Sequence, residues 1–460
     1  MNKTLILATI AGALGAFVFF YEIEGGKKRE EAEQYQSSLI KMDRDDIQSV
    51  TLIQEGGEII RYQRAGESWE ITEPIHTGVE ESAINGNHSA FANAIIQRTF
   101  DTTLDKLKNF SLEPARVEVI LESIEGRKVE LLIGDEAPTR GDLFVSFRDS
   151  NSVFITSDDV KSQAEKTLFD LRDKKIAHYE KDDVRRINIV SNNQTIVIEK
   201  SGDEWEMKRP DLPVEESRVN SFLTSLTNYS AKAFTAESFS DEAEYGFNRP
   251  EVKVTLSLGE EMASKDITIG GVVDEESDDP EYHGYESGLP AVFIIRESTK
   301  NNLSRDPFYF QDKQLARFDK EALTEIRISG AYQIPLAPQD TLGWYVNADT
   351  SFKIEDSDLS RFISAIDGVN AAELVADTPD DKGNYGLKIP FLEVVVKDTL
   401  GVSTGFSIGD PDDDNDRYAS SNGSERIYLV RLSQVERITG WIEEILGTDD
   451  DDQSAGISGT

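Results

Sequence analysis

The chain has 460 residues, too many for one ordinary hydrophobic core, and this length predicts about three domains. Its formal net charge is −39, from 87 acidic and 48 basic residues, and such a surface repels phosphate backbones, so nucleic acid is not expected as a partner. The absence of cysteine excludes disulfides, thiolate-bound metals, iron–sulfur clusters and a cysteine nucleophile.

The first element is an uncharged apolar run, TLILATIAGALGAFVFFY, at residues 4–21. A helix of this length extends about 27 Å, close to the roughly 30 Å of a hydrocarbon core. A cleaved signal peptide is the alternative, but its apolar region usually spans about 7–15 residues, and this run ends in bulky side chains. Residues 1–21 therefore predict an N-terminal transmembrane anchor in the bacterial inner membrane. We expect the bulk of the chain to be periplasmic, although the basic residues at 27–29 do not favour that orientation.

Polar segments flank the body of the chain. Residues 22–42 turn polar and helix-prone after a Gly pair, which predicts a short stalk or linker, with a disordered tether as the alternative. At the other end, TDDDDQSAGISGT at residues 448–460 has no apolar periodicity and predicts a disordered acidic tail.

Between these ends the same landmarks occur three times. The phrase YGFNRP at 245–250 recurs as YGLKIP at 385–390, and the first copy has FSLEP at 110–114 in the same place. A tryptophan and an Ile-Gly pair recur with offsets of 136 and 139 residues: Trp69, Trp205 and Trp344, then Ile133–Gly134, Ile269–Gly270 and Ile408–Gly409. These offsets predict three tandem repeats, at residues 43–177, 178–317 and 318–447.

Each repeat predicts strands, then a helix, then further strands. In the second copy, the helix at residues 216–229 has apolar residues at offsets 0, 3, 4 and 7, and the third copy matches it, with Asp356 or Ser357 as its cap. The later strands alternate between apolar and polar residues, which predicts one buried and one solvent-exposed face. The predicted fold class is α+β: three tandem repeats, each an antiparallel sheet with a packed helix, after one N-terminal transmembrane helix. The three tryptophans, Tyr245 and Tyr385 are expected to be structural.

One catalytic pattern is present, but its context argues against catalysis. GVSTG at residues 401–405 fits a hydrolase nucleophile elbow, which requires a strand that runs into a helix. Here the pattern lies between two stretches that predict a hairpin, so Ser403 is not expected to be a nucleophile. The histidines lack metal-binding spacing and are expected to be exposed and incidental: His76, His88, His178 and His283.

Two acidic loops occupy the same position in successive copies. Three aspartates in residues 410–416 alternate like the first ligands of a calcium loop, but Arg417 stands where that loop requires glycine. The second copy has DEESDDPE at 274–281, so both stretches predict solvated hairpin tips, with loose cation binding as the alternative. The sequence thus singles out no catalytic, cofactor-binding or metal-ligating residue.

The order of these landmarks resembles a known family. The tryptophan strand, the helix, the YGxxxP turn, the Ile-Gly strand and LRDKK at 171–175 are together similar to DUF4340, a bacterial domain family of unknown function. The first copy lacks the Tyr-Gly pair, and the third lacks the Leu-Arg of LRDKK. The resemblance covers residues 43–447. It implies a membrane-anchored envelope protein, often encoded near ABC-type export or gliding-motility-like components, and it supplies no catalytic residue.

Two hypotheses about function follow. The first is a non-enzymatic scaffold, anchored in the inner membrane through residues 4–21, that presents its repeats to a transporter subunit or another envelope protein. The second is a module that binds or hydrolyses an envelope polymer such as glycan, with carboxylates as acid and base. An enzyme should concentrate unusual residues in the cleft of one copy, whereas a scaffold should spread them along one face. We expect the scaffold, without nucleic acid or a small-molecule cofactor.

Overall fold

The computed structural model describes residues 35–148, 150–338, 343–346 and 353–446. The predicted anchor at 1–21, most of the predicted stalk and the predicted tail at 448–460 lie outside these residues. Among the helices that the structure describes, none is long and apolar enough to cross a membrane. The chain divides into two compact units, residues 1–175 with 230–233, and the remainder. The first unit contains one sheet, and the second unit contains two.

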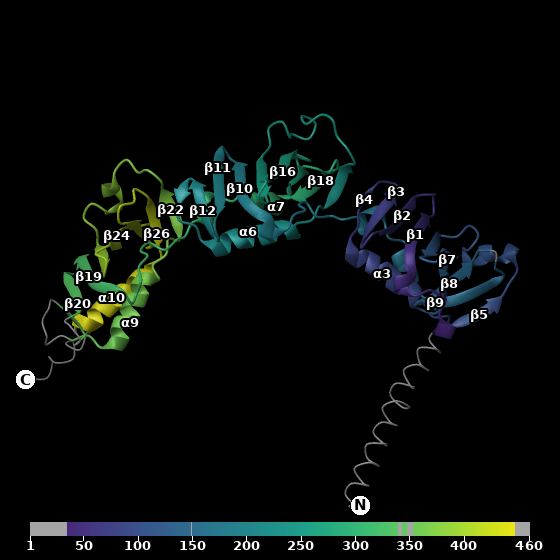
Figure 1. Cartoon of the computed structure of the whole chain (residues 1–460), viewed down its shortest axis with the longest axis horizontal. Helices are drawn as coiled ribbons and strands as arrows, with labels where there is room; N and C mark the ends of the chain where they lie inside the picture. The colour runs from purple at the N-terminus through teal and green to yellow at the C-terminus, as the bar shows by residue number, and fades with distance from the viewer. Residues whose placement is uncertain (1–34, 149, 339–342, 347–352, 447–460) are drawn as a thin grey trace, which may run out of the picture. The chain divides into compact units, whose positions relative to one another are not determined.

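The first sheet has nine strands in the order β4-β3-β2-β1-β6-β7-β8-β9-β5 (Figure 1). The chain forms a meander from β1 to β4, crosses through α3 to the opposite edge, where β5 pairs with β9, and returns to pair β6 with β1. Its elements are β1 (Ile47–Gln54), β2 (Ile59–Ala65), β3 (Ser68–Glu73), β4 (Thr77–Gly78), α3 (Glu81–Ala92), β5 (Arg98–Asp101), β6 (Val117–Ser123), β7 (Lys128–Glu136), β8 (Asp142–Phe147), β9 (Ser152–Ser157), α4 (Asp159–Ala164) and α5 (Leu168–Leu171).

The second sheet repeats this order with nine strands, and the third with eight. The second repeat contains β10 (Val184–Ser191), β11 (Gln194–Ser201), β12 (Glu204–Arg209), β13 (Asp211–Leu212), α6 (Glu216–Asn228), β14 (Ala233–Ala236), β15 (Val252–Leu258), β16 (Ala263–Val272), β17 (Glu281–Glu286), β18 (Val292–Arg296), α7 (Glu297–Leu303) and α8 (Pro307–Phe310). The third contains β19 (Leu323–Gly330), β20 (Ile334–Pro338), β21 (Trp344–Val346), α9 (Asp356–Asp367), β22 (Glu373–Ala376), β23 (Leu392–Asp398), β24 (Ser403–Pro411), β25 (Arg417–Ser421), β26 (Ile427–Val430) and α10 (Leu432–Leu446). The three-repeat α+β architecture is thus confirmed.

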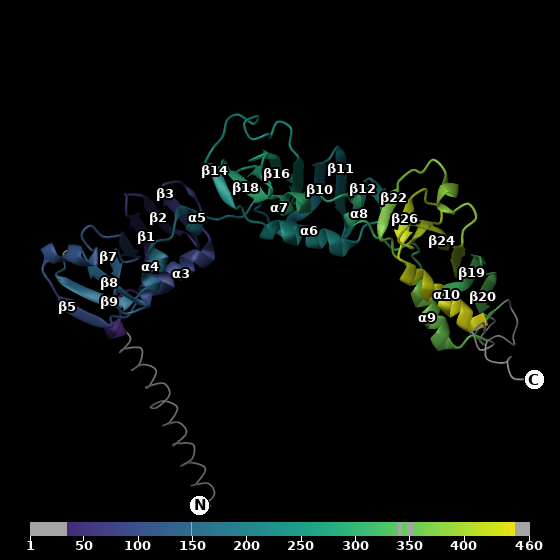
Figure 2. The ribbon, with the colours of Figure 1, turned by 180° about the vertical axis from the view of Figure 1, so that it is seen from behind.

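In the second and third repeats, one helix packs on its sheet through the apolar face that the sequence predicts. The buried residues keep the predicted spacing in the second and third repeats: Val219, Phe222, Leu223 and Leu226 in α6, and Leu359, Phe362, Ile363 and Ile366 in α9. Figure 2 shows α10 beside α9, where the ring of Trp441 stacks on Phe362 with 3.8 Å between centroids. Because α9 begins at Asp356, its N-cap is Glu355, and the predicted cap is wrong by one residue or two.

The opposite face of each sheet is also covered in its second half, which the alternating pattern did not predict. The loop between helix and sheet packs a second apolar cluster there: Leu107, Leu112, Leu132 and Val153 in the first repeat, and Tyr245, Phe247 and Val292 in the second. The central residues of β7 and β16 are therefore buried on both faces. The predicted solvent-exposed face is wrong for these strands, because a loop covers it.

The Ile-Gly landmark marks the point where this loop touches the sheet. A Cβ atom on Gly134, Gly270 or Gly409 would lie 2.1, 2.1 or 2.0 Å from a loop carbonyl oxygen, so only glycine fits. The carbonyl belongs to the landmark aromatic residue, Phe110, Tyr245 or Tyr385. The next residue has a left-handed backbone in all three repeats: Ser111 (φ 54), Gly246 (φ 75) and Gly386 (φ 70). The first repeat thus has the same turn conformation, although Phe110 and Ser111 replace the Tyr-Gly pair of the other two repeats.

The last residues of the predicted stalk belong to the first repeat. Leu39, Ile40 and Met42 are buried in its main core, and Ser38 pairs with Ile95. The predicted C-terminal bound of the stalk, residue 42, is therefore too late in the chain, because the apolar residues before it belong to the core of the first repeat.

Within the second unit, one linking segment at residues 307–317 joins the second and third repeats. Its first half bonds to the second repeat, with Asp312 N donating to Pro213 O at 2.9 Å. Its second half bonds to the third repeat, with Leu315 N donating to Val369 O at 3.0 Å. Backbone hydrogen bonds therefore attach this linking segment both to the repeat before it and to the repeat after it.

Candidate functional site

In every repeat, the segment that leads into the first strand meets the sheet at the same place. Matching backbone hydrogen bonds identify it: Leu39 N to Ala94 O at 2.6 Å, Ile176 N to Tyr229 O at 3.1 Å, and Leu315 N to Val369 O at 3.0 Å. Two residues later the segment carries a basic or imidazole side chain: Lys41, His178 or Arg317. We call this place the lead-in corner.

The strand residues of the three lead-in corners also correspond. The same backbone bond joins neighbouring strand ends in each repeat: Arg148 N to Glu130 O at 3.1 Å, Ser287 N to Asp266 O at 2.8 Å, and Asn422 N to Gly405 O at 2.9 Å. The residue before the donor faces the corner, and it is Phe147, Glu286 or Ser421. The backbone of the corner is thus the same in all three repeats, but the side chain at this position is aromatic in the first, acidic in the second and a hydroxyl in the third.

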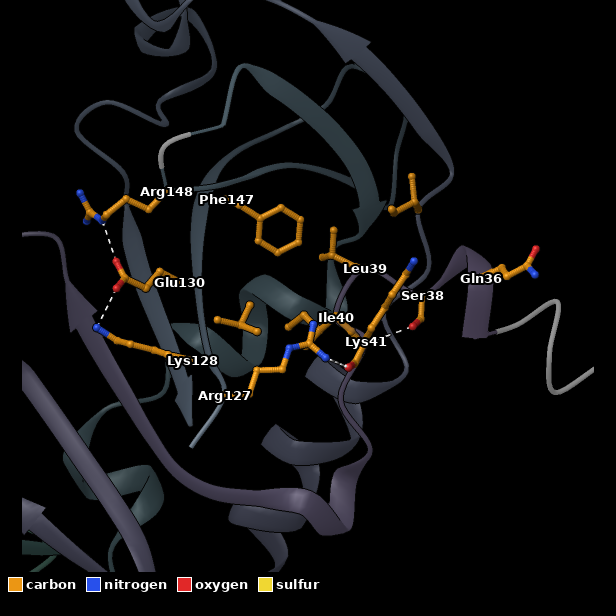
Figure 3. A pocket seen from close by; sticks show the side chains of 12 residues that line it. Gln36, Ser38, Leu39, Ile40, Lys41, Arg127, Lys128, Glu130, Phe147 and Arg148 are labelled. Atoms are coloured by element: carbon orange, nitrogen blue, oxygen red, sulfur yellow. Dashed lines mark hydrogen bonds and ion pairs between the residues drawn. The ribbon is translucent and has the colours of Figure 1, made fainter. Parts of the chain in front are cut away.

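The first lead-in corner encloses a hollow of about 570 Å³ (Figure 3). This volume lies within the range of pockets that hold small ligands. Its floor is apolar, with Leu39, Ile40 and Phe147, while basic side chains stand around it. The basic side chains are Lys41, Arg127, Lys128 and Arg148. This is an unusual concentration of positive charge on a chain of net charge −39.

Only part of this positive charge is compensated. Figure 3 shows Glu130 between Lys128 and Arg148, with Lys128 Nζ at 2.6 Å and Arg148 Nε at 3.1 Å from its carboxylate oxygens. The hydrogen bond from Lys128 lowers the pKa of Glu130. Arg127 donates to the carbonyl of Lys41, and among the described residues neither Lys41 nor Arg127 forms an ion pair with a carboxylate. The hollow thus presents two cations that its own acids do not neutralise.

The second lead-in corner contains a buried carboxylate in place of the hollow. Glu286 is fully buried and accepts hydrogen bonds from His178 N at 2.9 Å, His178 Nδ1 at 2.7 Å and Lys265 Nζ at 2.8 Å. Burial by itself would raise the pKa of Glu286, but the bonds from His178 and Lys265 outweigh it, so the pKa is lowered. The third corner is uncharged on its strands, with Thr404, Gly405 and Ser421.

The first repeat also carries a polar pair in its core. Asn87 and His88 are buried on α3 at the positions that Phe222 and Leu223 occupy on α6. The ring centroids of His88 and Trp69 are 4.5 Å apart, and the buried Nε2 of His88 has no hydrogen-bond partner among the residues that the structure describes. Burial first, and repulsion from Arg44 and Arg64 second, lower the pKa of His88 to about 4. The prediction of an exposed, incidental residue is therefore wrong for His88.

This buried imidazole makes the stability of the first repeat depend on pH. Unfolded histidine binds a proton below about pH 6.5, whereas buried His88 resists protonation down to about pH 4. We therefore expect the free energy of unfolding to fall by about 2 kcal/mol or more as pH drops through this window. His88→Leu, which introduces the residue of the second repeat, should flatten the dependence.

The measurement is denaturant-induced unfolding of the full chain at several pH values, read by pulsed hydrogen exchange on peptides from residues 47–157. His76→Gln is the control, because the His76 side chain is 74% exposed. An unchanged pH profile in His88→Leu would contradict the assignment.

The other sequence candidates lie at the surface. Ser403 is the first residue of β24 in the β23–β24 hairpin, as predicted, and no helix follows it. In the acidic loop at 410–416, Asp412 and Asp416 bond to backbone N–H groups. Across the described ranges, no group of three or more metal-binding side chains is arranged to hold an ion.

Comparison with known families matches this architecture. The family model described as a domain of unknown function, DUF4340, matches residues 69–211, 205–342 and 344–448. The chain belongs to the DUF4340 family. The predicted resemblance and the three-fold internal repeat are thus confirmed. No curated protein and no solved structure matches the chain.

The boundaries of the DUF4340 matches do not coincide with the boundaries of the sheets. The three matches begin at or within β3, β12 and β21, and the first two extend into or up to the next tryptophan strand. Each of these two DUF4340 units therefore contains the later strands of one sheet, the lead-in segment of the next repeat and the first strands of the next sheet. The segment that connects two sheets is part of the family pattern.

Proposed function

We propose that this DUF4340 protein is a non-enzymatic scaffold of the bacterial inner membrane. In this proposal residues 4–21 are a single-pass anchor, the bulk of the chain is periplasmic, and the repeats bind an envelope protein. The expected partner is a membrane subunit of an ABC-type or gliding-motility-like transport system, as the family resemblance implies.

The observation that carries this proposal is an exposed apolar side chain at the same hairpin tip in all three repeats. These residues are Ile124 (59% exposed), Met262 (43%) and Leu400 (87%). Each tip is held by one equivalent backbone bond: Ile124 N to Asp46 O at 2.8 Å, Gly259 N to Asp183 O at 2.8 Å, and Thr399 N to Ala322 O at 2.9 Å. A single exposed apolar residue is ordinary, but the recurrence of one in the same loop of tandem copies, at different positions of that loop, favours a protein contact surface.

The lead-in corners support the same proposal. The unusual residues do not gather in one copy, since the first corner is a basic hollow and the second holds a buried carboxylate. This distribution argues against a single reaction centre in one copy and so favours the scaffold over the enzyme. In a repeat array, variation on a constant framework lets each copy contact a different part of a partner.

Site-specific photocrosslinking in native membranes tests the proposal. A photoreactive residue at Met262 or Leu400, in the full chain, should crosslink to one membrane transport subunit that also copurifies with the unmodified chain. The same residue at Leu289 is the control, because Leu289 is 43% exposed but lies outside the tips. Recovery of envelope glycan without protein would overturn the scaffold and support the polymer-binding alternative.

The tips also yield a mutational prediction. Replacing Met262 and Leu400 together by aspartate should weaken partner binding about tenfold or more, since each substitution removes an apolar contact and buries an unpaired carboxylate in the interface, and about 1.4 kcal/mol in total is a tenfold change. Stability should not change, because both side chains are exposed. The measurement is the partner yield after affinity purification, with thermal unfolding as the control. An unchanged partner yield in this variant would show that the tips are not part of the interface.

A further inference from the structure

The basic hollow of the first lead-in corner has properties that the other two corners lack. Lys41 and Arg127 form no ion pair with a carboxylate in the described part of the chain, and they line a hollow of about 570 Å³ together with apolar residues such as Leu39 and Phe147. A ligand suited to this hollow carries a negative charge on an otherwise apolar or neutral body. The whole chain has a net charge of −39, and this negative charge repels such ligands from other parts of its surface.

The position of the hollow along the chain identifies the source of this ligand. Gln36 lines the hollow, and residues 22–34 are all that separates the described chain from the proposed anchor at 4–21. A segment of this length reaches about 45 Å when fully extended. The hollow is therefore tethered close to the bilayer, where the concentration of lipid headgroups is high.

Exposed apolar side chains accompany the basic ones. Tyr35, next to Gln36, is 50% exposed, and Ile124, in the same turn as Arg127, is 59% exposed. Basic residues with nearby aromatic and aliphatic side chains are typical of surfaces that rest on anionic membranes.

We propose that the first lead-in corner binds the phosphate headgroup of an anionic phospholipid, with Lys41 and Arg127 as its ligands. Binding docks the first repeat on the membrane that carries the anchor. The inference rests on the proposed function, because it needs the anchor. It adds a lipid site and fixes which repeat faces the bilayer.

The absence of cysteine allows a direct test on the full chain. Glu125→Cys places a single fluorescent label beside the tip of the first repeat. The labelled chain is reconstituted in phosphatidylcholine vesicles, with or without phosphatidylglycerol, that carry a nitroxide on some headgroups. We expect quenching of the label to rise several-fold when phosphatidylglycerol is present and to decline with added salt.

The double variant Lys41→Ala/Arg127→Ala should lose this response. Since each basic residue near an anionic surface contributes about 1 kcal/mol, the ratio of docked to undocked chains should fall about 30-fold. Arg249→Ala/Lys397→Ala, which removes the same charge from exposed side chains of the other repeats, should respond like the unmodified chain.

The outcomes separate the inference from the proposed function. If alkaline washing releases the chain from membranes, the anchor is wrong, and the proposed function fails with it. If the chain stays embedded but quenching is the same with and without phosphatidylglycerol, the lipid site is wrong and the scaffold stands. If the chain shows no response to phosphatidylglycerol but binds an acidic peptide, and Lys41→Ala/Arg127→Ala abolishes that binding, the lipid site is wrong and the hollow is assigned to a protein ligand.

Discussion

Gly270→Ala is expected to lower the free energy of unfolding of the second repeat by about 3 to 5 kcal/mol. The new methyl carbon would lie 2.1 Å from the carbonyl oxygen of Tyr245 and 2.7 Å from Cδ1 of Phe247. The first atom belongs to the backbone, so relief requires the loop to move off the sheet and to expose the second apolar cluster. Hydrogen exchange by mass spectrometry should show faster exchange throughout residues 239–296.

The neighbouring glycine provides a matched control. At Gly271 the nearest atom to a new Cβ, the carbonyl oxygen of Tyr245, is 3.7 Å away, an ordinary contact. Gly271→Ala should therefore cost less than about 1 kcal/mol. Equal losses in the two variants would show that the loop does not require glycine at the Ile-Gly position.

Glu286→Ala is expected to destabilise the second repeat by about 3 kcal/mol or more. The substitution removes the acceptor of three hydrogen bonds and leaves Lys265 without its carboxylate partner at a site with little access to water. Glu199→Ala is the control, since Glu199 pairs with Arg186 at 3.3 Å on the exposed side of the sheet and should contribute less than about 1 kcal/mol.

The same carboxylate has a pH signature. Because the folded-state pKa of Glu286 is lowered, its stabilising contribution is present above the ordinary glutamate pKa of about 4.3 and is lost as pH falls below it. The difference in unfolding free energy between the unmodified chain and Glu286→Gln should therefore narrow below about pH 4. Denaturant unfolding between pH 7 and pH 3 measures it. A constant difference would mean that the pKa of Glu286 is the same in the folded and the unfolded chain.

The repeat architecture could be predicted because its landmarks are positions where one residue type is required. Glycine recurs where a carbonyl oxygen occupies the place of a Cβ, and these constraints are local and strong. The tryptophans recur because they share surroundings: Arg64 lies over Trp69 at 5.1 Å, and Lys200 lies over Trp205 at 5.9 Å. Constraints of this kind cause the same residue types to recur at regular intervals in the sequence.

The lead-in corners could not be predicted because they join residues that are far apart in the sequence. His178 and Glu286 are separated by 108 residues, and no local pattern links an imidazole in a connecting segment to a carboxylate at a strand end. The polar core pair did leave a signal. Asn87 and His88 occupy two of the four apolar helix positions, and a column-by-column comparison of the copies would have marked them.

The linking segment at residues 307–317 bears on how such a chain can change in evolution. Because one stretch bonds to two repeats at once, inserting a few residues into it would separate bonds that must form together. The DUF4340 matches begin at the tryptophan strands. A duplication or deletion of one such unit, from one tryptophan strand to the next, would leave each linking segment beside equivalent bonding partners. Descendants of this chain should therefore gain or lose length in whole steps of about 136 to 139 residues.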